Sequence, residues 1–362
     1  MKRGERIADR LTTAALCLAA AFSLIAFSVA GRSKVFAQSN TSQKPSPATQ
    51  EAQDVEEGDV ISFRTTEVLL PVTVRDRYGK LVSTLTRNDF RIFEDGSEQR
   101  LSDLALRETP VDVVLMVDSS SSVAGNLDDF RHAALGFAQK LSPDDRISLI
   151  KFDDRIELLQ DWTRSRLQLR RSLDRVTPGM FTRFNDALLL AAKDQLKVGR
   201  VRHAVIVLTD GIDSERGYAT LPMALSALLE AQAIVYIVSN TEIERQSKQA
   251  ELNNLLAGTK AVRNFNSLRV DDLREGLRVL DESEARLAQL ATATGGRLYK
   301  PRSFADLDST YAEVADELRH QYTLYYSPSD KTRDGRFRRV RVETTDKSLN
   351  TSSRIGYFAP PK

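Results

Sequence analysis

The strongest pattern along the chain is an apolar segment of strand length, residues 111–117, which contains four valines and is followed by Asp118 and four serines. A continuous apolar segment of this kind is typical of a strand buried on both faces. Further apolar segments occur at residues 147–152, 204–209 and 234–238, with amphipathic segments between them. This alternation predicts the α/β class, with a doubly wound, mostly parallel sheet and helices on both faces.

The same periodicity places the remaining elements of this domain, which we expect to span residues 108–322. Short strands are predicted at residues 156–159 and 297–299, and helices at residues 128–140, 165–176, 184–197, 221–231, 284–293 and 306–320. Residues 242–281 are rich in charge and only weakly apolar. We expect them to be helical in part, since they are longer than an ordinary connection.

The segments on either side of this domain have a different pattern. Residues 60–107 and 323–358 alternate apolar and polar positions and contain Asp-Gly and Tyr-Gly turns, which predicts antiparallel strands. Neither segment has enough strands to be stable alone. We therefore expect the two segments to pack as one small β module.

The N-terminus has the composition of a targeting segment. Residues 1–37 combine a basic start, an apolar stretch at residues 11–30 and Val-Phe-Ala before Gln38, which predicts a signal peptide. The apolar stretch of about twenty residues, followed by Arg32 and Lys34, leaves a signal anchor open as the alternative. Residues 38–59 are polar and are expected to form a flexible linker. The protein is thus expected to be secreted or periplasmic, in the cell envelope, or anchored by residues 11–30.

Composition excludes several classes of function. Cys17 is the only cysteine and lies in the apolar N-terminal stretch, so the exported chain has no disulfide. Residues 1–37 carry six basic and two acidic residues, and without them 52 basic and 50 acidic residues become 46 and 48, a net charge of −2. Nucleic acid is therefore not an expected partner. Motifs for nucleophilic, zinc-protease or phosphate-loop chemistry do not occur, and we do not expect an enzyme.

Polar side chains stand where the predicted strands end. Asp118, Ser120 and Ser122 follow the first apolar segment, Asp210 follows another, and Thr182 precedes a predicted helix. In open α/β sheets, ligand sites lie outside the carboxyl ends of the strands. Hydroxyl and carboxylate oxygens suit a small, hard divalent cation.

These residues resemble the signature of the von Willebrand factor type A (VWFA) domain. Asp118, Ser120 and Ser122 match its Asp-x-Ser-x-Ser pattern, and Thr182 and Asp210 stand where the family has a threonine and a second acid. The resemblance implies a metal-ion-dependent adhesion site made of these five residues. Mg²⁺ is the expected cation, with Mn²⁺ or Ca²⁺ as alternatives, and a carboxylate of a protein ligand would complete its coordination. The flanking β segments resemble those of exported bacterial VWFA-domain proteins.

Other polar residues have simpler interpretations. Asp186 is either a second-shell partner of the metal site or an acid favoured in the first turn of a helix. Asp153 and Asp154 are expected in a solvated turn, and Asp213 in a loop without a ligand role. The histidines lack metal-ligand spacing and are expected at the surface or an interface; they are His132, His203 and His320.

Two classes of function follow from the sequence. The favoured one is an exported protein for adhesion or assembly that binds an acidic group on a partner through the cation. The alternative is a structural or regulatory subunit of an envelope complex in which the metal site is vestigial. Metal-dependent hydrolysis is disfavoured because no general base is apparent beside the site. Contact with a membrane is expected only through the N-terminal segment, if it stays uncleaved.

The N-terminal pattern makes a testable prediction. N-terminal sequencing of the exported protein should begin at Gln38, because the small residues Val35 and Ala37 flank Phe36 as a signal peptidase requires. Recovery of Met1 in the membrane fraction would instead establish the anchor.

Overall fold

The computed structural model describes residues 67–106, 110–121, 124–196, 201–214 and 216–362. The predicted signal peptide and linker, residues 1–37 and 38–59, lie outside the described residues. None of the described helices combines the length and the apolar character needed to cross a bilayer.

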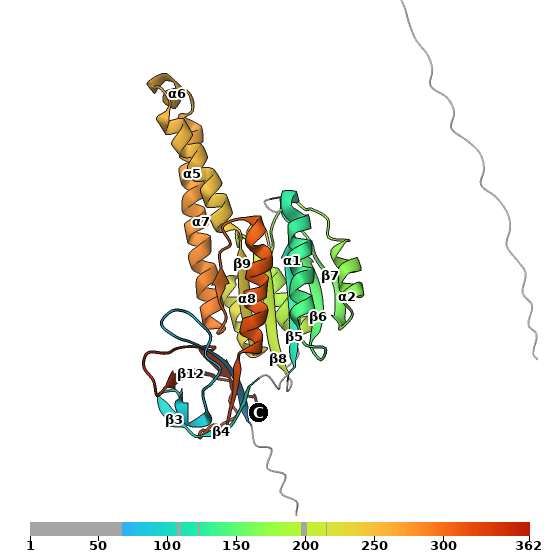
Figure 1. Cartoon of the computed structure of the whole chain (residues 1–362), viewed down its shortest axis with the longest axis vertical. Coiled ribbons are helices and arrows are strands. Elements are labelled where there is room, and N and C mark those ends of the chain that lie inside the picture. The colour runs from blue at the N-terminus through green and yellow to red at the C-terminus, as the bar shows by residue number, and fades with distance from the viewer. Residues whose placement is uncertain (1–66, 107–109, 122–123, 197–200, 215) are drawn as a thin grey trace, which may run out of the picture. The chain divides into compact units, whose positions relative to one another are not determined.

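A six-stranded sheet forms the centre of the α/β domain (Figure 1), and its strand order is β10-β9-β8-β5-β6-β7. The strands are β5 (Val111–Asp118), β6 (Arg146–Phe152), β7 (Ile156–Thr163), β8 (Arg202–Thr209), β9 (Ala233–Ser239) and β10 (Leu298–Tyr299). Neighbouring strands are parallel except β7, which pairs antiparallel with β6 and is longer than predicted. The predicted fold class is confirmed.

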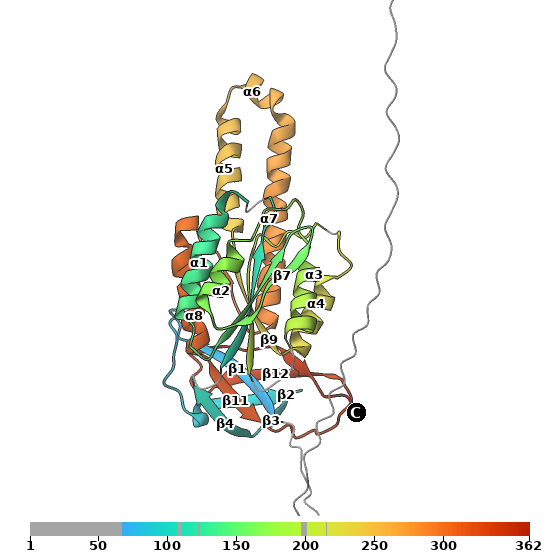
Figure 2. The ribbon, with the colours of Figure 1, turned by 90° about the vertical axis from the view of Figure 1, so that its right-hand side faces the viewer.

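Helices cover both faces of this sheet (Figure 2). One face packs against α1 (Leu127–Lys140), α2 (Arg166–Leu173) and α8 (Leu307–Arg319), and the other against α3 (Phe184–Leu190), α4 (Leu221–Glu230) and part of α7 (Ser267–Ala293). Side chains of β5 alternate between the two cores: Val113 and Leu115 lie in the first, and Val114 and Met116 in the second. Burial of each such side chain contributes about 1.5–3 kcal/mol. Short 3₁₀ turns are η1 (Arg87–Asp89), η2 (Ala124–Asn126) and η4 (Phe304–Asp306).

The helix predicted at residues 184–197 is not one regular helix. After α3 the chain continues as a π-helical segment, η3 (Ala191–Gln195), and the N–H of Leu196 donates to the carbonyl of Ala191. The wider turn places Ala191, Ala192 and Leu196 together in the second core. Packing of these side chains therefore decides the helix geometry, which propensity alone does not reveal.

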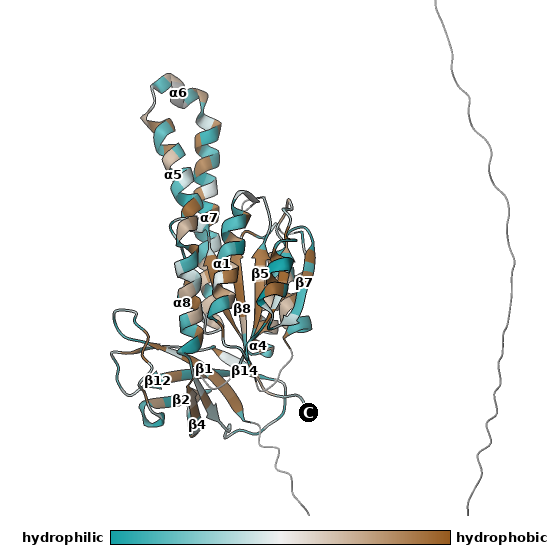
Figure 3. Cartoon of the chain, turned by 45° about the vertical axis from the view of Figure 1, so that its right-hand side comes forward, coloured by the Kyte–Doolittle hydropathy of each residue, from teal (hydrophilic) through white to brown (hydrophobic). Residues whose placement is uncertain are grey.

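A helical hairpin accounts for the charged segment. It consists of α5 (Thr241–Ala257), α6 (Lys260–Phe265) and α7, and it extends beyond the sheet. The separate helix predicted at residues 284–293 is the last part of α7, which runs unbroken through residues 281–284. Figure 3 shows the hairpin as a mixture of hydrophilic and hydrophobic residues, whereas β5 and β8 are hydrophobic. The buried apolar core between the two long helices is small in the described part of the chain and consists of Leu252, Val270 and Leu273, so the apolar pattern is weak.

Both flanks contribute strands to two small sheets. One has the order β13-β1-β11-β4 and consists of β1 (Val68–Arg75), β4 (Leu101–Leu106), β11 (Tyr322–Tyr326) and β13 (Asn350–Ser352). The other has the order β14-β12-β2-β3 and consists of β2 (Phe90–Glu94), β3 (Ser97–Gln99), β12 (Phe337–Thr344) and β14 (Gly356–Phe358). Apolar side chains of both sheets share one core. The predicted joint β module is thus present.

A buried acid connects strands of the β module from both ends of the chain. Glu94 accepts hydrogen bonds from the hydroxyls of Tyr326 at 2.7 Å and Tyr357 at 3.0 Å. Its other carboxylate oxygen lies 3.1 Å from the guanidinium of Arg338, which is also buried. The charge of Glu94 is therefore needed by three buried partners at once.

We predict that Glu94→Gln lowers the free energy of unfolding by about 3 kcal/mol, because it leaves buried Arg338 without a buried counter-ion. Urea denaturation measures the change. Glu98→Gln, which removes the surface partner of Arg91 in the neighbouring strand, is the control and should leave stability nearly unchanged. Equal effects of the two substitutions would contradict the importance of the buried pair.

Candidate metal site

Two strand ends meet at the carboxyl edge of the six-stranded sheet. Asp118 ends β5, and Asp210 follows the last residue of β8, the strand beside it. The hydroxyl of Thr209 donates to Oδ2 of Asp118 at 2.7 Å, and the N–H of Ser120 donates to Oδ1 at 2.9 Å. Hydrogen bonds thus orient the Asp118 carboxylate across the end of the neighbouring strand.

The loop that carries Thr182 is tied to both of these strand ends. The N–H of Gly179 donates to the carbonyl of Ser119 at 2.7 Å. Thr182 and Ser214 are linked twice, from the N–H of Thr182 to the Ser214 hydroxyl and from the N–H of Ser214 to the Thr182 carbonyl, each at 2.9 Å. All these bonds use the backbone of Thr182. Its hydroxyl, on a side chain that is 5% exposed, has no hydrogen-bond partner among the described residues.

The structure therefore places four of the five predicted ligands, Asp118, Ser120, Thr182 and Asp210, on loops that converge at one edge of the sheet. Ser122 lies outside the described residues. Each of the four is buried. Their role as metal ligands stays a prediction.

Burial gives this edge unusual electrostatics. Burial raises the pKa of Asp118 to about 7, and the negative charge of Asp210 is the second cause. Hydrogen bonds from Ser120 and Thr209 act in the opposite direction. Burial and the charge of Asp210 also raise the pKa of Glu244, in the first turn of α5, to about 7. Two carboxyl groups near Asp210 are thus costly to ionise.

Two polar residues that the sequence analysis did not single out belong to the same edge. Glu244 is one of them, because its carboxyl group senses the charge of Asp210. The other is Asn240, which directly follows β9, is 2% exposed, and has an Oδ1 atom without a hydrogen-bond partner among the described residues. The sequence did contain a signal, since Asn240 follows a third apolar strand in the way that Asp118 and Asp210 follow theirs.

The expectation of a solvated turn at residues 153 and 154 is wrong for Asp153. Asp153 is 1% exposed, accepts a hydrogen bond from the Ser119 hydroxyl at 2.8 Å and lies 2.7 Å from the ammonium of Lys151. Burial acts to raise its pKa, but Lys151 and the other donors hold the pKa below its ordinary value. Asp153 thus positions the loop after β5. Asp154 is exposed, as expected.

Asp186 and Asp213 also build loops. Asp186 accepts the N–H groups of Tyr218 at 3.2 Å and Ala219 at 2.8 Å and forms an ion pair with Arg183 at 2.7 Å. Asp213 accepts the N–H of Asn185 in the first turn of α3 at 2.9 Å. Asp186 lies in the first turn of α3, as one of its two predicted roles has it, and it also fixes the loop before α4.

The histidines do not gather at the site. His203 is 5% exposed, and its Nδ1 lies 2.8 Å from the carbonyl of Ala231, so the expectation of a surface or interface position is wrong for it. It faces the second core because successive side chains of β8 alternate between buried faces. His132 and His320 lie beside Asp308 and Asp316. The described part of the chain contains no group of three His, Cys, Asp or Glu residues suited to a metal ion.

Comparison with known proteins identifies the domain. Residues 113–212 match the model of the von Willebrand factor type A domain. An uncharacterized protein of Synechocystis is 31% identical over 116 residues, which are 31% of this chain and 27% of that protein, so the chain spans about a quarter of the relative. The match to the family model includes Asp118, Ser120, Thr182 and Asp210.

Two solved structures of low identity are also similar. Proximal thread matrix protein 1 of the mussel byssus, with a zinc-occupied metal-ion-dependent adhesion site, is 17% identical over 62% of this chain and 49% of that chain, with a TM-score of 0.43. An aerotolerance-related membrane protein of Bacteroides fragilis is 17% identical over 57% of this chain and 98% of that chain, with a TM-score of 0.41. The match to the family model thus supports a VWFA domain that includes residues 113–212 of this chain, as the sequence predicts.

The residues at the edge fit a divalent cation. The hydroxyl of Thr182, the acids Asp118 and Asp210, and Oδ1 of Asn240, which has no hydrogen-bond partner among the described residues, are oxygen donors of the kind that hard cations prefer. A cation would also lower the cost of ionising Asp118 beside Asp210. The cation site predicted from the sequence thus agrees with the chemistry of the buried groups.

This electrostatic arrangement predicts pH-dependent metal binding. The cation needs the carboxylate form of Asp118, whose pKa is about 7 in the metal-free protein. Lowering the pH from 8 to 6 should therefore weaken Mg²⁺ binding about tenfold and release a proton on binding at the lower pH. Without metal, the raised pKa of Asp118 makes the folded protein more stable at low pH than at high pH. This stabilisation is present below about pH 4 and is lost as the pH rises through 7.

Calorimetry in buffers of different ionisation enthalpy measures both affinity and proton release. Glu244→Gln is the control, because it removes the other acid of raised pKa. Metal binding by this variant should still weaken as the pH falls, since Asp118 is unchanged. An affinity that is equal at the two pH values would show that Asp118 does not have to lose a proton.

Proposed function

We propose that this protein is an exported, metal-dependent protein-binding protein for adhesion or assembly. A divalent cation, Mg²⁺ in the first instance, would be held by Asp118, Ser120, Ser122, Thr182 and Asp210, and it would bind a carboxylate on a partner protein. The N-terminal signal or anchor would place the protein in the envelope or outside the cell. The chain would act by binding, without catalysing a reaction.

One observation carries this proposal: the Thr182 hydroxyl has no hydrogen-bond partner among the described residues, while the backbone of Thr182 is held on both sides. The loop is fixed by Ser214 without using that hydroxyl. A hydroxyl that makes no hydrogen bond within the described part of the protein is available to a ligand. A hard cation is the ligand that we propose, because the same edge carries buried acids.

The alternative, a subunit of an envelope complex with a vestigial metal site, also has a supporting observation. Both carboxylate oxygens of Asp118 already accept hydrogen bonds, from Thr209 and from Ser120. Such a group can persist without a cation when it is protonated, as its raised pKa allows near neutral pH. Metal binding by the purified protein separates the two functions.

We predict that Thr182→Ala weakens the binding of Mg²⁺ or Mn²⁺ at least about tenfold, because a ligand is lost, while the fold is retained. Calorimetry measures the affinity, and circular dichroism the fold. Thr292→Ala, an exposed threonine on α7, is the matched control and should bind metal like the wild type.

The partner is tested by pull-down from the envelope fraction of the source in Mg²⁺ and in chelator. The proposal expects a protein captured only with Mg²⁺ and lost with Thr182→Ala. Metal affinity unchanged in Thr182→Ala would exclude Thr182 as a ligand. Absence of metal binding by the wild type would favour the vestigial site.

A further inference from the structure

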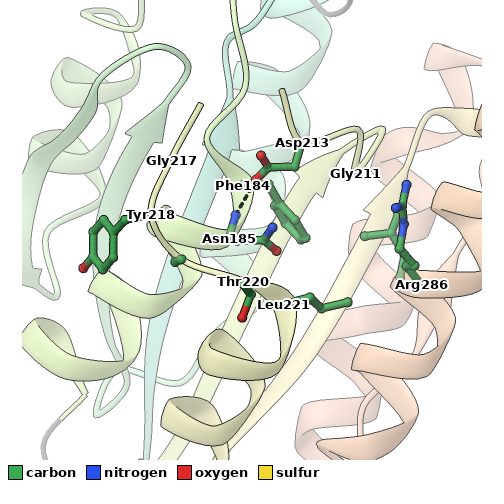
Figure 4. A pocket seen from close by; sticks show the side chains of 11 residues that line it. Phe184, Asn185, Gly211, Asp213, Gly217, Tyr218, Thr220, Leu221 and Arg286 are labelled. Carbon is green, nitrogen blue, oxygen red and sulfur yellow. Dashed lines mark hydrogen bonds between the residues drawn. The ribbon is translucent and has the colours of Figure 1, made fainter. Parts of the chain in front are cut away.

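A cleft of about 400 Å³ lies beside the proposed metal site. Figure 4 shows its walls: Phe184 comes from α3, Tyr218 from the loop before α4, Leu221 from α4 and Arg286 from α7, and Gly211 lies between them. This volume is within the range of clefts that hold small ligands or a few side chains. The cleft is therefore large enough for a short segment of a partner.

The cleft and the metal site share the loop after β8. Gly211 lines the cleft and directly follows Asp210. The hydroxyl of Ser283 on α7 donates to the carbonyl of Asp210 at 2.6 Å. Leu287, one turn further along α7, packs against Gly211 so closely that a Cβ there would lie 2.6 Å from its side chain. Arg286 is on the same part of α7 and lines the cleft.

Arg286 is a cation without a counter-ion among the described residues. Glu282, four residues earlier on α7, pairs with Arg278 instead. The acid that lines the cleft, Asp213, holds the N–H of Asn185. By contrast, Arg245 on α5 has ion pairs with Asp281 and Glu284 of α7. The cleft thus offers an exposed guanidinium, which suits a carboxylate as a two-point ligand.

The opposite wall is aromatic and apolar. Tyr218 is 72% exposed, although the backbone of its loop is fixed by Asp186. Leu221, at the start of α4, is half-buried beside it. An exposed aromatic ring on a fixed backbone is typical of residues that dominate binding to a partner, because little conformational freedom is lost.

We propose that the cleft binds the partner segment whose acidic residue reaches the cation, and that this segment carries a second carboxylate for Arg286 and an apolar side chain for the wall of Tyr218 and Leu221. This inference rests on the proposed function. It identifies the partner chemically as a protein segment in which two acidic residues flank an apolar one. Specificity then comes from the cleft, whereas the cation supplies an attraction shared by any carboxylate.

A peptide-display selection on the immobilised full chain tests this inference. A library of random linear peptides is selected in Mg²⁺ and in chelator, on the wild type and on Arg286→Gln. The wild type should enrich, only in Mg²⁺, peptides with two acids that flank an apolar residue. A synthetic peptide of that sequence should bind Arg286→Gln about tenfold more weakly. Arg274→Gln, at an exposed arginine earlier on α7, should bind it like the wild type.

The outcomes separate this inference from the proposed function. Metal-dependent enrichment of peptides with a single acid, bound equally by Arg286→Gln, would overturn the role of the cleft and leave the metal-dependent function standing. Absence of any metal-dependent enrichment, with metal binding verified by calorimetry, would overturn both. Replacement of the synthetic peptide's second acid by glutamine should have no further effect on Arg286→Gln, and an additional loss there would also contradict the proposed contact.

Discussion

The central constraint in this protein is the burial of Asp118 beside Asp210 at the ends of adjacent parallel strands. Taking a carboxylate out of water is costly, and a second negative charge adds to the cost, so the pKa of Asp118 rises to about 7. Hydrogen bonds from Ser120 and Thr209 offset only part of this effect. The geometry of the surrounding loops is what one expects of a site that a divalent cation completes.

Other acids near the same edge show the contrast. Asp153 lies 2.7 Å from Lys151, and Asp186 lies 2.7 Å from Arg183, so each of these structural acids has a cation of its own. Both also accept backbone N–H groups that fix loops next to the ligands. Asp118 has hydroxyl and N–H donors instead of a basic side chain. Asp153 and Asp186, which fix loops, thus each have a basic partner, whereas Asp118, the acid proposed to bind metal, has hydroxyl and N–H donors.

The β module contacts the α/β domain away from this edge. Gln321, which lies between α8 and β11, accepts a hydrogen bond from Arg202 at the start of β8 at 3.4 Å. It donates to the hydroxyls of Tyr236 in β9 at 3.0 Å and of Thr73 in β1 at 3.3 Å. These contacts lie toward the amino ends of the central strands. The proposed metal site, the cleft and the α5–α7 hairpin lie at the carboxyl edge. Ser283 on α7, the last helix of the hairpin, donates a hydrogen bond to the carbonyl of Asp210. One end of the sheet thus serves assembly of the chain itself, and the other is available to a partner.

The fold class could be predicted from the sequence, and so could the edge of the sheet at which Asp118, Ser120, Thr182 and Asp210 lie, because buried parallel strands need continuous apolar segments and polar residues after them lie at one edge. Other features could not be predicted in this way. The burial of Asp153 and His203, the proximity of Glu244 to Asp210 and the cleft beside Arg286 each depend on contacts between residues far apart in the chain, which no local pattern records. For residues 242–281 the sequence predicted only partial helix, and the hairpin could not be predicted because its helices bury little apolar surface, so the periodicity that marks a helix is weak.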